Sequence, residues 1–196
     1  MSILTNNALP ELLCPAGDLF RLKTAVDFGA DAVYLAGQEF GMRTASSNFS
    51  KEDLKEGIEY AHKNGVKVHI TCNTLPHDDE MVRLPEFLSF VDEIGADAVI
   101  SGDLGTINMV KKYAPNCELH VSVQSGIVNS ATANAFYEMG AKRVVLAREL
   151  SLEEIATRID SATFELQNGA TIDATNRVIN LPCVTPAPVA RTINIT

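Results

Sequence analysis

A short phrase recurs along the chain, and it is the feature that most restricts the fold. Gly-Ala-Asp-Ala-Val at residues 29–33 returns at 95–99, and a basic version, Gly-Ala-Lys-Arg-Val, occupies 140–144. A looser copy starts at Gly65. Each copy follows a helical pattern and opens a β-branched run, so the glycine marks where a helix ends and a buried strand begins. Repeats of this kind build α/β barrels or doubly wound sheets.

The hydrophobic pattern predicts six βα units. The expected strands cover residues 11–16, 32–36, 66–72, 98–101, 119–123 and 143–147. Helices are expected between them, and the pairs Ser50/Asp53 and Ser151/Glu154 match capping boxes that open two helices. A complete eight-unit barrel typically needs about 250 residues. We therefore predict an incomplete TIM-type (β/α) barrel with parallel strands.

The sequence divides into three parts by composition. Residues 1–10 are an N-terminal extension, 11–159 form the partial barrel, and 160–196 are a divergent tail rich in Thr, Asn, Ala and Pro. Asn168-Gly169 favours a β-hairpin within 162–178, and the prolines after it predict that residues 181–196 are mostly disordered or extended. Six units leave two open strand edges. We expect low stability in isolation, or association with a second copy or a partner subunit that covers an edge.

Composition restricts the partners and the compartment. The formal net charge of −9 disfavours binding of nucleic-acid phosphates by the chain as a whole. No stretch approaches the roughly 18–20 apolar residues of a membrane span, and no secretory signal is recognisable, which favours the cytoplasm. The four cysteines are isolated from one another in the sequence, so their spacing predicts reduced thiols and no metal or cofactor site.

Polar residues follow the predicted strands at their carboxyl ends, where this architecture builds a pocket. We predict a substrate-binding set without assigned catalysis: Arg43, Asn48, Asn73, His77, Asp103, Gln124 and Arg148. Each of these residues could instead have a structural role, in which it caps a strand or bonds to a loop. Arg43 suits a carboxylate or phosphate clamp as well as a structural salt bridge, and Asp103 suits a substrate hydroxyl as well as a helix cap.

The histidines receive separate interpretations. His77 is the best acid/base candidate by type, although fixing of the loop backbone is its simpler role. His62 and His120 are expected at the surface or a strand edge, and His69 inside a strand. No nucleophile motif accompanies His77, so a protease triad is not supported, and no phosphate-binding glycine loop is present.

Several segments resemble one known family. They are Glu11–Asp18, Gly29–Leu35, Gly37–Arg43, Asn48–Ser50, Asn73–His77, Ser122–Gln124 and the long run 143–155, Arg-Val-Val-Leu-Ala-Arg-Glu-Leu-Ser-Leu-Glu-Glu-Ile. Over about residues 11–159 the chain resembles the collagenase-like peptidases, peptidase family U32.

The resemblance implies a barrel and two kinds of activity. The family is named for peptide hydrolysis, whereas several relatives act in hydroxylation of a transfer-RNA wobble uridine (prephenate-linked), of ribosomal RNA or of a ubiquinone precursor. Those relatives carry an iron–sulfur cluster on four cysteines. The cysteine motifs expected after Ile159 are absent here, and Cys183 does not match them. The first hypothesis is therefore a family enzyme, and the alternative is a non-catalytic remnant or binding subunit without the cluster half.

Overall fold

The computed structural model describes residues 11–42, 48–151, 154–155, 172–173, 178–179 and 193–194. These residues fall into two compact units. One comprises Leu12–Ser122, and the other combines Glu11 with described residues from Val123 onward.

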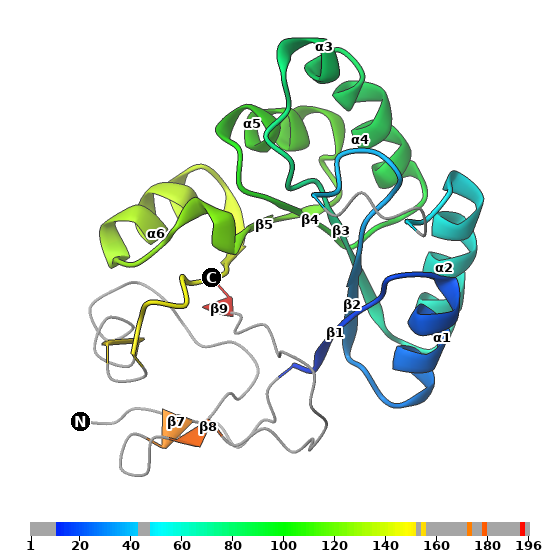
Figure 1. Ribbon diagram of the computed structural model, residues 1–196, viewed down its shortest axis with the longest axis horizontal. Helices are drawn as coiled ribbons and strands as arrows, with labels where there is room; N and C mark the ends of the chain where they lie inside the picture. The colour runs from blue at the N-terminus through cyan, green and yellow to red at the C-terminus, as the bar shows by residue number, and fades with distance from the viewer. Residues whose placement is uncertain are drawn as a thin grey trace. The chain divides into compact units, whose positions relative to one another are not determined.

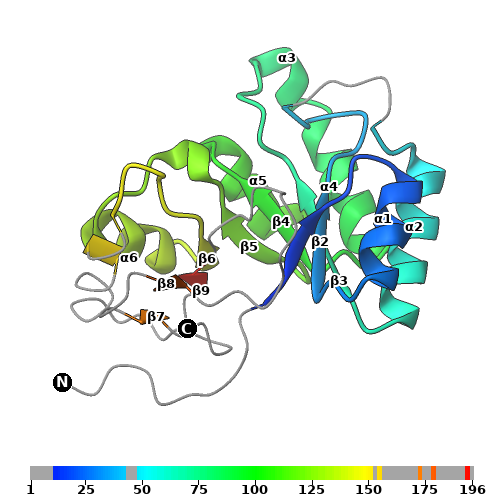
Figure 2. The same cartoon turned by 60° about the horizontal axis from the view of Figure 1, so that its bottom comes forward.

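The unit Leu12–Ser122 is a parallel sheet in which each strand pairs with the next in the chain. Its strands are β1 Leu13–Pro15, β2 Ala32–Leu35, β3 Lys67–Thr71, β4 Ala98–Ser101 and β5 Glu118–Val121. The helices are α1 Leu19–Asp27, α2 Lys51–Lys63, α3 Asp78–Met81, α4 Leu84–Glu93 and α5 Leu104–Tyr113. The longer helices, α1, α2, α4 and α5, lie on the same convex side of the curved sheet (Figure 1 and Figure 2). This is the arrangement of an incomplete (β/α) barrel, and it confirms the predicted fold class.

The repeated glycines end helices as the sequence predicts. Gly29, Gly65 and Gly95 follow α1, α2 and α4, and all three have positive φ angles of 89°, 73° and 81°. Only glycine adopts this left-handed conformation without steric cost, so the residue is required at each joint. Gly140 in the other unit has a φ of 94° and plays the same part.

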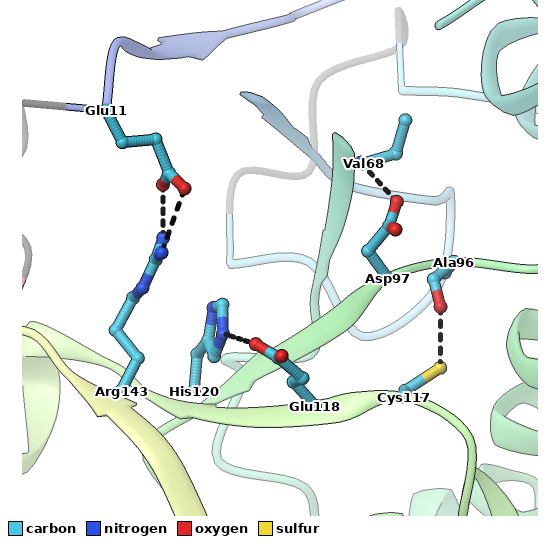
Figure 3. A network of polar contacts seen from close by, with 8 residues as sticks. All are labelled: Glu11, Val68, Ala96, Asp97, Cys117, Glu118, His120 and Arg143. Atoms are coloured by element: carbon cyan, nitrogen blue, oxygen red, sulfur yellow. Dashed lines mark hydrogen bonds and ion pairs between the residues drawn. The ribbon is translucent and has the colours of Figure 1, made fainter. Parts of the chain in front are cut away.

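The aspartates of the phrase connect neighbouring strands. Oδ2 of Asp31 accepts the amide of Leu12 at 2.7 Å, while the Asp31 carbonyl accepts the amide of Lys67. Asp97 repeats the pattern, because its Oδ2 accepts the amide of Val68 at 2.7 Å (Figure 3). Its carbonyl accepts the amide of Glu118. Each aspartate therefore bonds the strand before its own and the strand after it, which fixes their register.

The two faces of the sheet differ in chemistry. One face carries a fully buried aliphatic layer that includes Val33, Ile70 and Val99. Residues on the other face alternate with these, and they include Tyr34, His69, Thr71, Ile100 and His120. This second face holds the buried histidines as well as the partly exposed Tyr34, Thr71 and Ile100.

The second unit contains α6 Ser130–Glu138, β6 Ala141–Val144 and the short strands β7 Ile172–Asp173, β8 Val178–Ile179 and β9 Ile193–Asn194, preceded by a 3-10 turn at Val123–Ser125. The strand β9 pairs antiparallel with β6, and β7 pairs antiparallel with β8. Leu146, Leu150 and Ile155 form a small apolar cluster. The predicted capping box is confirmed, since Ser151 and Glu154 exchange side-chain hydrogen bonds with each other's amides.

Arg143 and Glu11 form a bidentate ion pair in this unit. Nη1 and Nη2 of Arg143 donate to the two carboxylate oxygens of Glu11 at 2.6 and 3.1 Å (Figure 3). The side chains are only 6% and 15% exposed. This bidentate pair joins residues 132 positions apart in the sequence.

The last part of the chain brings one correction. The sixth strand is Ala141–Val144, not 143–147 as predicted, because it begins directly after Gly140 and its apolar run continues beyond the strand. Ile193–Asn194, within the end that was predicted to be mostly disordered or extended, form β9 and pair with β6. The Asn168-Gly169 turn lies outside the described residues, and the described antiparallel pair β7–β8 lies beyond it in the chain.

Candidate binding site at the strand ends

The loop after β2 is held against the end of β3 by Asn73. Oδ1 of Asn73 accepts the amide of Met42 at 3.0 Å. In return, the carbonyl of Phe40 accepts the amides of Asn73 and Thr74 at 3.1 and 3.3 Å. The side chain of this predicted binding residue therefore positions a loop at the carboxyl end of the sheet, where ligands bind in this architecture.

Phe40 gives the loop its unusual backbone. Its φ of 60° makes it the single residue other than glycine with positive φ in the described part of the chain. The ring is buried, packs against Phe87 at 5.4 Å between centroids and lies beneath the Arg83 guanidinium. Nη1 of Arg83 also donates to Oε2 of Glu39 at 2.9 Å. A bulky residue in this conformation costs free energy, which these contacts offset, and such strain clusters at functional loops.

Asn48 closes the same loop from its other end. Nδ2 of Asn48 donates to the carbonyl of Gly37 at 3.2 Å, while the amides of Gln38 and Phe49 bond across the loop to Phe49 and Ala36. The ends of the loop are thus joined side by side. Arg43, predicted to clamp an anion, lies outside the described residues, as do Ser46 and Ser47.

Two further predicted residues begin helices. Asp103 caps α5, because its Oδ1 accepts hydrogen bonds from the amide of Thr106 at 2.8 Å and from the hydroxyl of Thr106 at 3.1 Å. His77 precedes α3 and is exposed, and its amide donates to Oε2 of Glu80 at 2.9 Å. The bonds shown by both residues are structural, and a substrate role for either one stays a prediction.

The remaining predicted residues belong to the second unit. Gln124 lies in the 3-10 turn and Arg148 follows β6, and both side chains are exposed. Asn48, Asn73, His77 and Asp103 belong to the unit Leu12–Ser122, in the segments that follow β2, β3 and β4.

Sequence reasoning placed one histidine wrongly. His120 is only 1% exposed, not at the surface, and its ring meets that of His69, also 1% exposed, edge to face at 4.7 Å between centroids. Ala98 lies on β4 between their strands, and its small side chain leaves room for the contact. The alternation of residues in β5 predicts on which face of the sheet His120 lies. Whether that face is buried depends on packing against other strands, which the pattern within β5 does not contain. His62 lies at the surface as expected, 2.8 Å from Oδ2 of Asp97.

Cys72 and Cys117 are unactivated thiols. Burial raises the pKa of Cys72 well above its usual range, and burial followed by the nearby Asp92 raises the pKa of Cys117 to about 12. Sγ of Cys117 donates to the carbonyl of Ala96 at 3.1 Å. Both groups are protonated at neutral pH, whereas metal ligands and nucleophiles require the thiolate.

The described part of the chain offers neither a grouped set of metal ligands nor a membrane-spanning helix. Within residues 11–42 and 48–151 and the short segments beyond them, no three His, Cys, Asp or Glu side chains are grouped to hold a metal ion. No helix in the same part of the chain is long and apolar enough to cross a membrane.

Parallel strands that alternate with outer helices, and polar side chains that order the loops at the strand ends, define an α/β protein of the (β/α)-barrel type. The chain belongs to peptidase family U32, whose family model matches residues 17–170. The match continues past residue 159, where the motifs suggested that the resemblance ends.

Curated relatives support the assignment. The chain is 46% identical over 145 residues to "Uncharacterized protease MJ0090" of Methanocaldococcus jannaschii, which covers 74% of this chain and 35% of the relative. It is 39% identical over 159 residues to tRNA hydroxylation protein P1 of Bacillus subtilis, covering 81% and 38%. It is also 39% identical over 145 residues to the 23S rRNA 5-hydroxycytidine C2501 synthase of Escherichia coli, covering 74% and 22%. The chain thus spans little more than a third of their length at most.

Solved structures confirm the fold. The U32 peptidase Mk0906 superposes with a TM-score of 0.63 at 15% identity, over 81% of this chain and 68% of that one. Phosphonopyruvate hydrolase superposes with a TM-score of 0.56 at 15% identity, over 83% and 66%.

Proposed function

We propose that this chain supplies the strand-end substrate-binding part of a cytoplasmic RNA hydroxylation protein of family U32. The observation that carries the proposal is its 39% identity to a tRNA hydroxylation protein over 81% of this chain. That stretch includes the loop held by Asn73 and Asn48, so the ordered loop lies in the part shared with an RNA-modifying relative.

The proposed binding residues are those predicted from the sequence. Asn48, Asn73 and Asp103 hold loops and helix starts at one edge of the sheet, and His77 stands exposed at the same edge. Arg43 and Arg148 are the proposed cations for an anionic group of the substrate, because a guanidinium matches a carboxylate or phosphate by its planar fork. Local cations are needed since the net charge of −9 repels polyanions.

A binding subunit without a cofactor is the second candidate, and the cysteines favour it. The raised pKa of Cys72 and of Cys117 keeps both thiols protonated, which opposes their use as cluster ligands. The relatives' iron–sulfur chemistry would then reside outside this chain.

Expression of the full chain in a Bacillus subtilis strain that lacks its tRNA hydroxylation proteins tests the first candidate. Mass spectrometry of the tRNA nucleosides measures hydroxylated wobble uridine, and iron and sulfide are assayed on anaerobically purified protein. Restored hydroxylation supports the enzyme, and Arg148→Ala should reduce it while the exposed control Lys142→Ala should not. Well-folded chain without restored hydroxylation, iron or sulfide overturns the enzyme in favour of the binding subunit.

A further inference from the structure

The outer side of α1 carries an exposed apolar stripe. Phe20, Thr24 and Phe28 follow one another at intervals of four residues, so they lie on one side of the helix and its C-cap. Phe20 is 79% exposed and Phe28 is 86% exposed. Oγ1 of Thr24 donates to the carbonyl of Phe20 at 2.9 Å, so the hydroxyl between the two rings already has a partner. These three residues, the α1 stripe, therefore form an apolar surface that needs no further polar contact.

The neighbouring helix α2 is built like α1 and lies beside it on the sheet (Figure 1 and Figure 2). Asp18 caps α1, and Ser50 caps α2. In both helices the residues four and eight positions after the cap are buried: Leu22 and Val26 in α1, Leu54 and Ile58 in α2. The two helices therefore turn equivalent positions toward the sheet, and their other sides can be compared position by position.

Positions six and ten after the cap of α2 contact the helix before it. Oε1 of Glu56 accepts a hydrogen bond from Nζ of Lys23 at 2.7 Å. The hydroxyl of Tyr60 donates to Oδ1 of Asp27 at 2.5 Å, and Nζ of Lys23 lies 5.4 Å from the centroid of the Tyr60 ring. In α1 the same two positions belong to the α1 stripe. The stripe is thus on the side with which a helix of this repeat packs against another helix.

The α1 stripe is symmetrical about Thr24, which makes α1 of a second copy a matching partner. When two copies of α1 pack antiparallel with their Thr24 residues opposite each other, Phe20 of each copy lies beside Phe28 of the other. The short side chain of Thr24 lets the two helices approach at the centre, and the rings stack on either side of it. This arrangement has two-fold symmetry, which is the commonest symmetry of protein dimers.

The charges around the stripe also suit a second copy. The net charge of −9 makes two copies repel each other on average. The charged residues of α1 and its cap are two acids and two bases that balance: Asp18, Arg21, Lys23 and Asp27. All four are paired within the chain, in the Arg21–Asp18 and Lys23–Glu56 ion pairs and the Tyr60–Asp27 hydrogen bond. The stripe therefore lies on a locally neutral part of an acidic chain.

The area of the stripe sets the expected strength of association. A buried aromatic side chain contributes about 150–250 Å², so the rings of two stripes together bury roughly 600–1,000 Å². A stable interface of standard size buries about 1,600 Å². We propose that the α1 stripe is a self-association surface, through which two copies of the chain form a reversible antiparallel dimer that dissociates on dilution. This inference does not depend on the proposed role in RNA hydroxylation.

Sedimentation equilibrium of the full chain over a range of about 1 μM to 1 mM tests the association. The weight-average mass should rise with concentration from 21.2 kDa toward twice that value. The double variant Phe20→Ser/Phe28→Ser should raise the dissociation constant at least about tenfold. Leu75→Ser/Val82→Ser is the matched control, because it also removes two apolar side chains, 71% and 79% exposed, outside α1. The control should dimerise like the wild-type protein.

Oxidative cross-linking tests the antiparallel geometry. Thr24→Cys should form a disulfide-linked dimer faster than the wild-type protein, which reports the background from the native cysteines, whereas Glu52→Cys on exposed α2 surface should not exceed that background. A wild-type chain that stays monomeric over the whole range overturns the proposal, as does a dimer that the Phe20→Ser/Phe28→Ser variant leaves intact. A dimer without the Thr24→Cys cross-link overturns the antiparallel arrangement. The wild-type concentration series decides the matter if the serine variant does not fold.

Discussion

Replacement of Arg143 by Met should destabilise the second unit strongly, because it leaves the carboxylate of Glu11 buried without its partner. Both guanidinium nitrogens bond that carboxylate, at 2.6 and 3.1 Å, and the two side chains are 6% and 15% exposed. Removal of one partner of such a buried pair costs about 3–5 kcal/mol. The residual exposure of Glu11 places the expected loss near the lower end, at about 3 kcal/mol.

The double variant Glu11→Gln/Arg143→Met separates the pair from its burial cost. Without either charge the unit should regain most of the loss, since a buried ion pair contributes little net stability relative to uncharged residues of similar volume. A double-mutant cycle by urea denaturation, with hydrogen exchange of a peptide over residues 141–146 as the local probe, measures both quantities.

Two controls sharpen the comparison. Lys142→Met changes the exposed neighbour of Arg143 on the same strand. Glu56→Gln breaks the exposed Lys23–Glu56 pair at 2.7 Å, whose side chains are 36% and 58% exposed, and should cost at most about 1 kcal/mol. If Arg143→Met costs no more than Glu56→Gln, or if the double variant is as unstable as the single one, the reasoning from burial is refuted.

Three further changes test other parts of the structure. Gly95→Ala should cost about 1–2 kcal/mol in thermal unfolding because its φ is 81°, whereas Gly17→Ala, with ordinary contacts and no positive φ, should cost less, and equal costs would contradict the role of the left-handed joint. Ser101→Ala should leave urea stability unchanged or raise it by up to about 1–3 kcal/mol, since the buried hydroxyl has no hydrogen-bond partner among the described residues, and a clear loss would reveal an unseen partner. Asn73→Ala should speed hydrogen exchange at the Met42 amide while Asn73→Asp, which keeps an acceptor oxygen, should not; equal rates would show that Asn73 does not hold the loop.

The scaffold could be predicted because its signals are local. The positive φ of Gly29, Gly65 and Gly95 and the capping boxes at Ser50 and Ser151 depend on residues within one turn of each other. The bounds of β6 were predicted too far along the chain, because the apolar run continues to Ala147, whereas the pairing of the strand with β9 ends at Val144.

Other features of the structure could not be predicted from the sequence pattern. The helix α3 is a single turn, and it lacks the apolar stripe by which a helix is predicted from sequence. Burial of His120 arises from a ring on another strand, and a pattern within β5 does not contain it. In the candidate site, the positions of Asn48 and Asn73 after predicted strands indicated both residues. Their hydrogen bonds to the loop could not be predicted, because they depend on the positive φ of Phe40, for which the sequence contains no motif.

The aspartate connectors also say how such a sheet can be extended. Asp31 precedes β2 and accepts the amide of Leu12 beside β1, and Asp97 precedes β4 and accepts the amide of Val68 in β3. Each carboxylate therefore belongs to the later strand and bonds the earlier one. A duplicated unit therefore brings its own means of attachment and requires no change in its predecessor. The corresponding position is Lys67 in the third strand and Lys142 in the sixth, so the carboxylate is supplied at alternate junctions of the first four strands. A pair of βα units is therefore the smallest stretch of these four strands that always carries one such connector.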